Sequence, residues 1–561
     1  MRFAQSFHSR ILPAMSGHDR RSGAQGCAQS LAMAHRRSFR DAIEILNGLI
    51  TKKRGGGGAV VDLDRSPSTH DSSRWENHFQ LVADHLKLLG LEEPVSKLSV
   101  IHVAGTKGKG STCAFVERIL RASGFRTALF TSPHLLDIRE RFRLNGEEVS
   151  EETFNQYFWW CWDHLQANEA EQGLPMPRLF RFLTILAFKM FTSEDVDVAI
   201  LEVGLGGRCD ATNVVRNPAI CGVASLGYDH MEILGNTLAE IATEKAGIFK
   251  AGVPAVTVPQ PAEALEALKK RALELNIPLE TAAPLETYNL GDLKLGLQGE
   301  HQRTNAALAV ALCRGWAERT DHQEHKAILN EALEQGRLPD SYIKGLVEVR
   351  WAGRAEIVRE KKLSFYLDGA HSPESMEACA KWFSSAARAD NIHKENEEIS
   401  AFDIKQFNTP TSNSRQILLF NCMPKRDPNL LFPPLLDICK QQDISLELAI
   451  FVPPYSSYTS IDNTHDSPVD PDLSWQKVLQ QHWESFKEKD SKAGDYRREF
   501  LSGLENGYSS CHFGVSSAVM PSLPAAIDWL RFCSARHPNL HLQVLVTGSL
   551  YLVGDVLRLL K

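Results

Sequence analysis

A glycine-rich segment between a buried strand and a helix constrains this sequence more than any other feature. Leu98–Val103 is an apolar run of strand length, the chain then reads VAGTKGKGST from Val103, and Ser111–Ser123 has a helical pattern. At such a junction, glycines let backbone N–H groups wrap around phosphate oxygens, and a lysine can reach the β- and γ-phosphates of a nucleotide. The segment therefore predicts a nucleotide-binding α/β domain. The alternative is a glycine-rich turn that only connects strand to helix.

The loop departs from the commonest phosphate-binding pattern, Gly-x4-Gly-Lys-Ser/Thr. That pattern would place a hydroxyl directly after Lys109, but Gly110 stands there and Ser111 follows one position later. The hydroxyl at the common position usually ligates Mg²⁺. The loop alone therefore leaves the magnesium-ligating hydroxyl unassigned.

The alternation of strands and helices indicates the fold class. Strand-length apolar runs of the first half lie at Leu98–Val103, Thr127–Phe130, Val196–Val203 and Ala219–Ser225, and helical segments at Ser111–Ser123, Leu238–Phe249 and Ala262–Leu275. The second half offers strands at Ala355–Val358, Leu363–Leu367, Gln416–Phe420, Leu446–Phe451 and Leu542–Val546, and a helix at Pro521–Phe532. Such alternation predicts an α/β protein with largely parallel sheets covered by helices. We expect a P-loop domain followed by a second, Rossmann-like α/β domain.

The length of 561 residues suits two or three domains, and the 43% hydrophobic and 23% charged composition is typical of soluble globular proteins. The predicted divisions are residues 1–40, a mitochondrial transit segment; 41–74, a helix and a mobile insert; 75–345, the P-loop domain; and 346–561, the second α/β domain with polar insertions near 386–414 and 456–499. The boundary between the two large domains is expected near Gly345.

The leader is rich in arginine: the first forty residues hold seven Arg, no Lys and one acidic residue, Asp19. This composition is typical of a mitochondrial transit peptide, and an ordinary basic tail is the alternative. Met15 and Met33 could start a shorter, cytosolic form. We therefore expect mitochondrial protein, in the matrix or associated with the inner membrane, and cytosolic protein as well.

Charge and cysteine usage exclude several other classes. The formal net charge of −7 offers no global field for nucleic acid, so any polyanion must bind locally. The eleven cysteines are scattered and form no Cys-x-x-Cys pair, which argues against a disulfide framework or a zinc cluster. No apolar run approaches the roughly 20 residues that a transmembrane helix needs.

Further polar residues are expected at the ends of strands, where α/β sheets bind ligands. Glu202 ends one strand and is a candidate magnesium ligand, although an acid at such a position often caps a loop. His230 follows the next strand and could ligate a metal or orient a substrate, or simply be a hydrogen-bonded loop histidine. In the second half, Asp368 and His371 end a strand, with an Asp-Gly turn as the alternative reading.

Several segments together, in order, resemble the Mur ligase superfamily and, within it, the folylpolyglutamate synthases of the eukaryotic type. The segments are HVAGTKGKGST, TSPHLLDIRERFRLNG, LEVGLGGRCDATN, the Asp-His pair at Asp229, EIATEKAGIFK, GEHQRTNAA, WAGR, LDGAHSPES and VTGSLYLVGDVL. The resemblance runs from about Trp75 to Lys561, outside the polar insertions. One segment departs from the pattern of the family. Relatives often carry Gly-Asp-Arg-Asp where this chain has Met423–Asp427, so Lys425 is given no role. The two consecutive residues Arg426 and Asp427 are retained.

The resemblance implies a Mur-ligase-type central domain and an ATP-dependent ligase that adds L-glutamate to the γ-carboxylate of the glutamate tail of tetrahydrofolates. ATP would phosphorylate that carboxylate, and the amine of the incoming glutamate would attack the acyl phosphate. The implied partners are ATP, L-glutamate, and reduced folates with their polyglutamates. The implied cofactor is Mg²⁺, with a monovalent cation as a further candidate. The protein is expected to be a monomer.

The resemblance also implies roles for individual residues. It assigns catalysis to Lys109, Glu202, His230 and Lys245; nucleotide binding to Gly105, Thr106, Lys107, Gly108, Lys109, Gly110, Ser111, Asn305, Arg354 and Asp368; metal binding to Ser132, Glu202 and His230; and proximity to glutamate and phosphate to His371 and Ser549. Lys245 matches a lysine that is carbamylated in relatives. The loop Ser132–Arg143 resembles the segment that closes over the folate.

Two alternatives remain. A dihydrofolate synthase, or a bifunctional enzyme, would use the same nucleotide site to join the first glutamate to dihydropteroate. A nucleotide-switch protein is more remote, because no guanine-reading Asn-Lys-x-Asp segment occurs.

Overall fold

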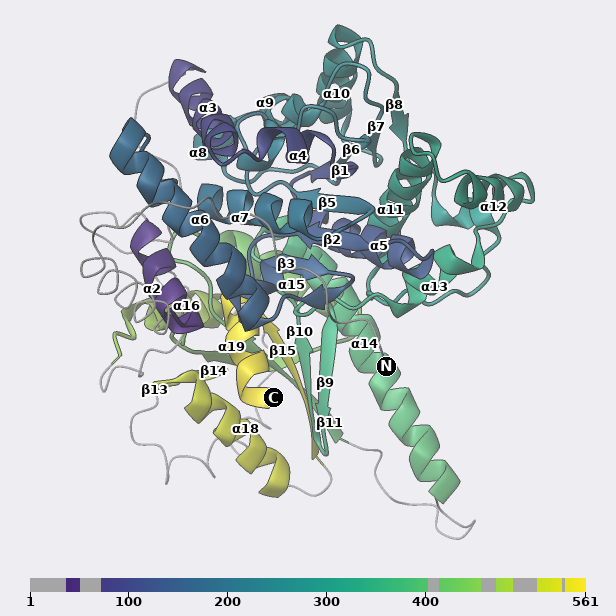
Figure 1. The fold of residues 1–561 in the computed structure, drawn as a ribbon. Helices are drawn as coiled ribbons and strands as arrows, with labels where there is room; N and C mark the ends of the chain where they lie inside the picture. Colours follow the sequence, from purple (N-terminus) through teal and green to yellow (C-terminus); the bar gives the residue numbers. More distant parts are fainter. Residues whose placement is uncertain (1–36, 51–71, 402–412, 456–470, 488–511, 537–539) are drawn as a thin grey trace, which may run out of the picture.

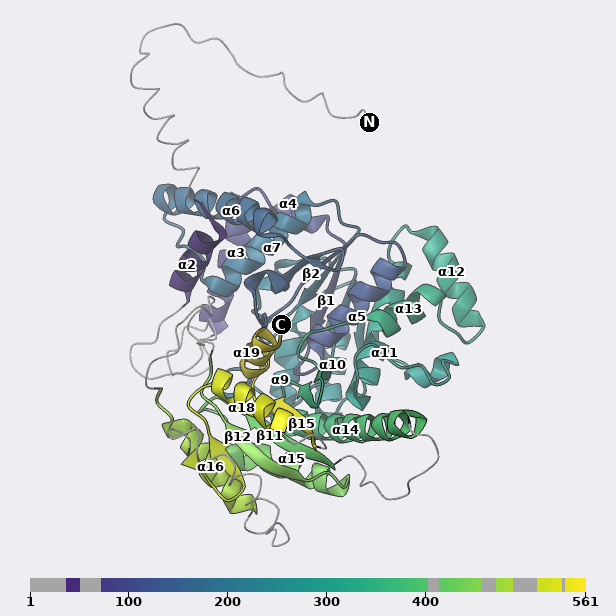
Figure 2. The same ribbon diagram turned by 90° about the horizontal axis from the view of Figure 1, so that it is seen from below.

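The computed structural model describes residues 37–50, 72–401, 413–455, 471–487, 512–536 and 540–561. Two sheets, each covered by helices, form two domains that meet along one side (Figures 1 and 2). The strands of the first sheet are β1 (Val100–Ala104), β2 (Thr127–Phe130), β3 (Phe142–Leu144), β4 (Glu147–Glu148), β5 (Val198–Glu202), β6 (Ile220–Val223), β7 (Ala255–Thr257) and β8 (Leu279–Thr281).

The first sheet has the strand order β4-β3-β2-β5-β1-β6-β7-β8. The strands from β2 to β8 in this order are parallel, and β3 and β4 add an antiparallel edge. Every residue of β1 and β5 is buried, as expected for central strands whose two faces are both covered by helices. Since β1 lies between β5 and β6, the loops that follow these three strands meet at one edge of the sheet.

The second sheet consists of β9 (Glu356–Glu360), β10 (Leu363–Leu367), β11 (Asn413–Phe420), β12 (Leu446–Phe451), β13 (His512–Phe513), β14 (Ser517–Val519) and β15 (Leu540–Thr547). Its order is β13-β14-β12-β11-β15-β10-β9, and only the edge strands β13 and β9 are antiparallel to their neighbours. The predicted two α/β units with largely parallel sheets are therefore confirmed.

Helices bury both faces of each sheet. The first domain has α2 (Phe39–Leu49), α3 (Ser72–Leu88), α4 (Glu92–Ser96), α5 (Lys109–Ala122), α6 (Glu151–Gln172), α7 (Leu179–Ser193), α8 (Met231–Leu234), α9 (Leu238–Lys245), α10 (Ala262–Glu274), α11 (Glu300–Glu318), α12 (Gln323–Glu334) and α13 (Asp340–Glu348). The second has α14 (Pro373–Ala401), α15 (Pro428–Gln441), α16 (Ser474–Lys487), α18 (Leu523–Arg536) and α19 (Leu550–Leu560). None of the described helices is both long and apolar enough to span a membrane.

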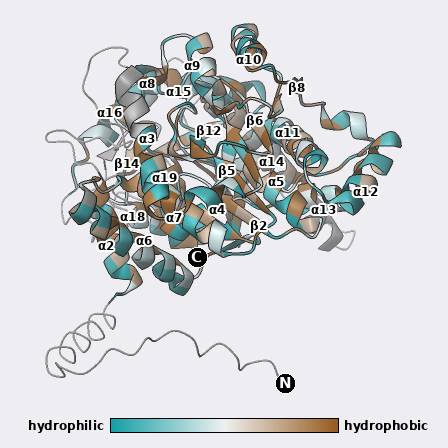
Figure 3. Cartoon of the chain, turned by 45° about the horizontal axis from the view of Figure 1, so that its top comes forward, coloured by the Kyte–Doolittle hydropathy of each residue, from teal (hydrophilic) through white to brown (hydrophobic). Residues whose placement is uncertain are grey.

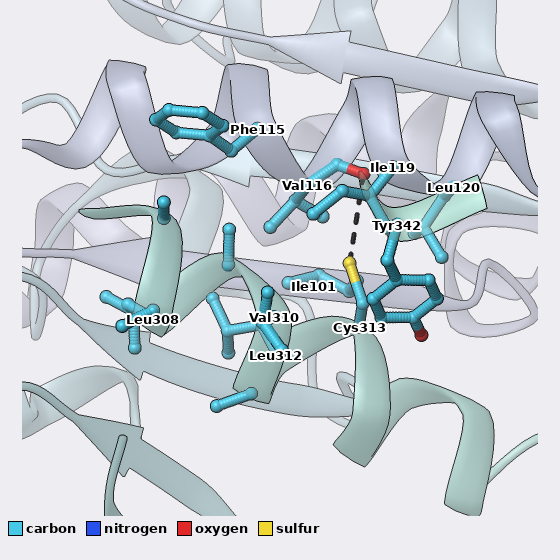
Figure 4. Close-up of a cluster of buried hydrophobic side chains, with 14 of the residues drawn as sticks. Ile101, Phe115, Val116, Ile119, Leu120, Leu308, Val310, Leu312, Cys313 and Tyr342 are labelled. Atoms are coloured by element: carbon cyan, nitrogen blue, oxygen red, sulfur yellow. Dashed lines mark hydrogen bonds between the residues drawn. The ribbon is translucent and has the colours of Figure 1, made fainter. Parts of the chain in front are cut away.

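Helix α5, which follows the phosphate loop, packs into an apolar core of the first domain. Its apolar side chains, among them Phe115 and Ile119, meet Leu308 and Leu312 of α11 and Tyr342 of α13 (Figure 4). Hydrophobic residues concentrate on the strands, while the peripheral helices α10 and α12 carry much of the hydrophilic surface (Figure 3). The strand ends therefore rest on a closely packed base.

The structure differs from two of the sequence predictions. Helix α14 continues to Ala401 and so covers the first part of the predicted insertion near 386–414. Helix α16 lies inside the predicted insertion near 456–499, because Leu479 and Trp483 form an apolar stripe at helical spacing that packs against the second sheet. The intervening residues 480–482 are Gln, Gln and His, so the stripe does not stand out as an apolar run in the sequence.

The last residues of the predicted transit segment, residues 1–40, contact the first domain. The side chain of Ser38 caps α2, and Arg37 forms an ion pair with Asp163 of α6, so residues 37–40 belong to the first domain. The remainder of the leader, with Met15 and Met33, and the predicted mobile segment at 51–71 lie outside the described residues.

Candidate active site

The phosphate loop connects β1 to α5 at the edge where the parallel strands end. The backbone N–H groups of Thr106 and Lys107 both donate to the carbonyl oxygen of Ser225, each at 3.0 Å, which fixes the loop to the end of β6. Gly108 has φ +83°, and a Cβ atom there would lie 2.1 Å from Oδ1 of Asn305. Only glycine can therefore stand at position 108 without backbone strain and without displacing the Asn305 side chain.

Asn305 lies against this loop, as the sequence predicts for a residue that reaches the nucleotide from α11. Its Nδ2 donates to Oε1 of Gln302 at 2.9 Å, and Nε2 of Gln302 donates to Oγ of Ser111 at 3.4 Å. Both side chains are buried. Contact of Asn305 with ATP itself stays a prediction.

Glu202 and Ser132 lie together at the ends of neighbouring strands. The backbone N–H of Ser132 donates to Oε2 of Glu202 at 3.0 Å, and the Glu202 side chain is only 5% exposed. Burial raises the pKa of Glu202, while the positive charges of Lys109, Arg354 and Arg141 act in the opposite direction. The site therefore holds one buried carboxylate facing a group of cations.

The residues predicted to bind magnesium fit a hard cation in their chemistry. Glu202 offers carboxylate oxygens and Ser132 a hydroxyl, which are donors that Mg²⁺ accepts. His230 lines the same cavity as Ser132 and has a left-handed backbone with φ +52°. Among the described residues, no three His, Cys, Asp or Glu side chains form a ready-made metal cluster, so the protein would supply only part of the coordination shell.

Lys245 is buried beneath the phosphate loop. Its side chain is 4% exposed, and Nζ donates to the carbonyl oxygen of Gly105 at 2.8 Å. Burial, and secondarily the charge of Lys109, lowers the pKa of Lys245 to about 7. Helical lysines are mostly solvated, so the sequence pattern alone could not have distinguished this amine.

Arg354 and Asp368 belong to the second domain and lie on the side that faces the first domain. Arg354 shares a small cavity with Glu202, Ser132 and Gly110. The Asp368 carboxylate accepts hydrogen bonds from the backbone N–H groups of Ala355 and Ala370, both at 3.0 Å. Asp368 thus stabilises the turn after β10, and its predicted contact with ATP would be additional to this role.

His371 and Lys107 join the two domains directly. Nζ of Lys107 lies 3.3 Å from Nε2 of His371, and Nδ1 of His371 lies 2.7 Å from the carbonyl oxygen of Gly369. Burial, followed by the nearby Lys107 charge, lowers the pKa of His371 to about 3. His371 is therefore neutral, donates from Nδ1 to Gly369, and accepts from Lys107 at Nε2.

Ser549 lies beside this turn but has a structural partner. It is 5% exposed and caps α19 by accepting from the backbone N–H of Tyr551 at 3.2 Å. The neighbouring Gly548 donates to the carbonyl oxygen of Ala370 at 2.9 Å. The proximity of Ser549 to glutamate and phosphate, which the resemblance implies, stays a prediction.

A cavity of about 330 Å³ opens next to Ser132 and His230. Phe180 and Leu183 of α7 give it an apolar wall, and Arg141 contributes a cation. The Arg141 side chain is buried, and its Nε donates to Nδ1 of His134 at 2.9 Å. Burial lowers the pKa of Arg141 to about 10, although the nearby charges of Glu202 and Glu140 act in the opposite direction, so Arg141 stays protonated at neutral pH.

Sequences of known proteins align with most of this chain. A folylpolyglutamate synthase of Arabidopsis thaliana is 48% identical over 564 residues, which cover 93% of this chain and 87% of the relative. This chain belongs to the folylpolyglutamate synthase family. The human protein, named as mitochondrial, is 37% identical and the alignment covers 93% of this chain and 92% of the relative. No protein-family model matches the chain.

Solved folylpolyglutamate synthases share the fold. A Mycobacterium tuberculosis folylpolyglutamate synthase complexed with ADP and AMPPCP has a TM-score of 0.61 at 23% identity, with 86% of this chain and 95% of that chain covered. E. coli FolC in complex with DHPP and ADP has a TM-score of 0.58 at 21% identity, with 93% and 98% covered. The family and the Mur-ligase-type two-domain fold expected from the sequence are confirmed.

The sequence pattern assigned no role to Arg426, which the structure places between the two domains. The sequence retains the adjacent Arg426 and Asp427 of the family's motif without indicating their partners. Both Nη atoms of Arg426 donate to Oδ1 of Asp229 in the first domain at 3.2 Å, and Asp427 caps α15. Asp229 also accepts from Nζ of Lys107 at 3.0 Å. Although burial opposes it, the charges of Lys107, His230 and Arg426 hold the pKa of Asp229 far below its usual value.

Proposed function

We propose that the chain is an ADP-forming ligase that adds L-glutamate to the γ-carboxylate of tetrahydrofolate and its polyglutamates, as its family name and its site both suggest. One observation carries this proposal: the phosphate loop of the first domain lies against the Asp368–His371 turn of the second through the contact of Lys107 with His371. A nucleotide on the loop would therefore face a second domain able to bind the incoming amino acid.

The proposed chemistry begins at a carboxylate, which is a poor electrophile. Transfer of the γ-phosphoryl group of ATP to the terminal γ-carboxylate of folate breaks the bond between the γ-phosphorus and the bridging oxygen and releases ADP. The amine of glutamate then attacks the acyl carbon, phosphate leaves with the electron pair of the C–O bond, and the amine gives up a proton. Catalysis is then mainly positioning and charge stabilisation.

The side chains at the loop are suited to this task. Lys109 lies in the first turn of α5, where its amine can offset charge on the transferring phosphoryl group. Glu202 and Ser132, with His230 nearby, would hold Mg²⁺. When bound, Mg²⁺ would neutralise charge on the phosphate oxygens. Arg354 would add a positive charge from the second domain.

We assign the folate to the cavity beside Ser132 and His230. Its apolar wall at Phe180 and Leu183 suits an aromatic ring system, and the cationic Arg141 at its polar end suits a carboxylate. One relative of known structure is described as a complex with AMPPCP and folate, and E. coli FolC as a complex with DHPP. Ser132 lines this cavity and its backbone N–H donates to Glu202, so a γ-carboxylate bound near Ser132 would lie close to the transferable phosphate.

Product analysis tests the function. The purified chain, incubated with tetrahydrofolate, glutamate and ATP, is expected to release ADP only when glutamate is present and to extend folate by glutamate residues visible in mass spectra. Glutamate ligation to dihydropteroate, together with rescue of a strain that lacks dihydrofolate synthase, would favour the bifunctional alternative. Hydrolysis of GTP without glutamate would favour a nucleotide switch and contradict the proposal.

Lys245 gives a pH-dependent prediction. We propose that its neutral amine is carbamylated by CO₂, which converts a buried cation into an anionic oxygen donor. The folded-state pKa of about 7 lies below the ordinary value of 10.5, so between those pH values the unfolded chain still binds a proton that the folded protein has released. The free energy of unfolding therefore rises with pH across that window. Lys245→Met should remove this dependence from thermal melts between pH 7 and 10.

The same variant should also lower ligation, and adding bicarbonate should stimulate the wild type alone. Lys245→Arg, which keeps a charge that cannot be carbamylated, is the control for activity. Full activity of Lys245→Met without bicarbonate would contradict the role.

We further propose that the protein occurs in mitochondria, in line with the names of its hamster and human relatives, and in the cytosol through starts at Met15 or Met33. Both starts would preserve the Ser38 cap of α2. N-terminal sequencing of protein from separated mitochondria and cytosol tests this, and a mature N-terminus beyond residue 39 would contradict it. We expect the enzyme to act as a monomer.

A further inference from the structure

Leu135 belongs to a loop of the first domain but packs within the core of the second. The loop follows β2 and carries Ser132, yet the Leu135 side chain is 8% exposed and joins the cluster formed by Leu552, Val553 and Val556 of α19. Helix α19 itself lies where the two domains meet (Figures 1 and 2). One apolar side chain therefore crosses the boundary between the domains.

Two glycines make room for this crossing. A Cβ atom on Gly554 of α19 would lie 2.5 Å from the backbone oxygen of Leu135, and one on Gly353 would lie 3.2 Å from Cδ2 of Leu135 and 2.9 Å from Cγ1 of Val553. Gly554 has an ordinary helical backbone, so its lack of a side chain serves the close approach and not the conformation. We call the space between Gly353 and Gly554 the Leu135 notch.

A hydrogen bond adds to the apolar contact. Nη2 of Arg558, also on α19, donates to the carbonyl oxygen of Leu136 at 3.1 Å. The second domain thus holds consecutive residues of the loop, one by packing and one by a charge-assisted hydrogen bond.

The loop transmits this hold because its own backbone is fixed. The Glu140 carboxylate accepts from the backbone N–H groups of Leu135 and Leu136, both at 2.6 Å, and of Asp137 at 2.8 Å. Nε of Arg141 donates to Nδ1 of His134 at 2.9 Å. Side-chain hydrogen bonds therefore connect residues 134–141 to one another, and a displacement of Leu135 would move both Arg141 and the preceding Ser132.

We propose that insertion of Leu135 into its notch is the contact through which the second domain positions Ser132 and Arg141 for ligation. When the domains are together, α19 fixes the loop and completes the magnesium and folate sites; when Leu135 leaves the notch, both residues are released at once. Leu135, Gly554 and Arg558 are positioning residues in this scheme. The inference rests on the proposed roles of Ser132 and Arg141.

Gly554→Ala tests the proposal. Alanine favours helix more than glycine does, so α19 should fold at least as well, and any loss of activity reports the displaced loop. Because small misplacements at an active site are costly, we expect kcat to fall at least about 10-fold. The KM for folate and the Mg²⁺ concentration for half-maximal activity should rise, while the KM for ATP stays unchanged, since the phosphate loop has other supports.

Matched variants separate positioning from general damage. Gly48→Ala, at a helical glycine with nothing within 4 Å of its Cβ position, and Leu273→Ala, at a leucine that is 81% exposed, should behave as wild type. Leu135→Ala should reproduce the Gly554→Ala profile. The double variant should be no worse than the more severe single one, because both break the same contact. Arg558→Lys should retain more activity than Arg558→Ala.

Wild-type kcat and Mg²⁺ dependence in Gly554→Ala and Leu135→Ala would overturn the proposal. So would fully additive effects, which would mean that the two residues act separately. A failure of the proposed function is distinguishable, because the wild type itself would then show no glutamate-dependent release of ADP and no extended folate. An active wild type beside a normal Gly554→Ala protein would reject only the positioning role.

Discussion

Glu202→Gln should abolish ligation while leaving the fold intact. Glutamine has nearly the same shape, and β5 keeps its backbone pairing with β1 and β2. The substitution removes the buried negative charge that faces Lys109, Arg354 and Arg141, and with it the carboxylate ligand proposed for Mg²⁺. By analogy with other lost transition-state contacts, we expect kcat to fall by about 100-fold or more, measured as glutamate-dependent release of ADP.

Two controls define this result. The melting temperature should not fall, because a neutral group is easier to bury than a charged one. Glu202→Asp retains the charge on a shorter side chain and should keep part of the activity at raised Mg²⁺. Near-normal turnover of Glu202→Gln would show that the buried carboxylate takes no part in the reaction.

The pH dependence of the wild type gives a further prediction. Burial raises the Glu202 pKa, so the carboxylate is protonated at a higher pH than an exposed glutamate would be. As the pH is lowered, ligation should therefore begin to fall at a correspondingly higher pH.

The local parts of the site could be predicted from sequence because each depends on short-range patterns. The strand–loop–helix at Gly105–Ser111 is fixed by apolar runs and by glycines that leave no room for a side chain, as Gly108 does against Asn305. Glu202 follows from the same reasoning, since a polar residue at the end of a buried strand must lie at the edge of a parallel sheet.

Contacts between the domains could not be predicted in this way. Arg426 pairs with Asp229 across nearly 200 positions of sequence, and no periodicity in either segment points to the other. Leu135 reads as an ordinary loop leucine, although it is buried in the opposite domain. Lys245 looks like any helical lysine, because its unusual pKa arises from packing beneath a loop that is distant in sequence. These properties depend on how the sheets are placed together, and not on local pattern.

Lys109→Ala should also abolish ligation, and the neighbouring Lys107 makes the reason specific. Lys107 is already engaged by Asp229 and His371 at the domain boundary, whereas the Lys109 amine has a long, 3.4 Å hydrogen bond to the carbonyl oxygen of Thr106 and lies close enough to Glu202 to influence its charge. Lys109 is therefore the loop cation that can turn to a phosphoryl group at little cost. Its removal should lower kcat by about 100-fold or more.

The comparison of the two lysines supplies the measurement. Lys109→Ala should retain the domain contact, so its melting temperature should match that of the wild type. Lys107→Ala should lower the melting temperature, because Asp229 loses a partner in a partly buried ion pair. Lys97→Ala, at an exposed lysine paired only with Glu93, is the matched surface control and should remain fully active. Normal single-turnover rates in Lys109→Ala would contradict its assignment to the transferring phosphate, because that step is the one at which its charge is expected to act.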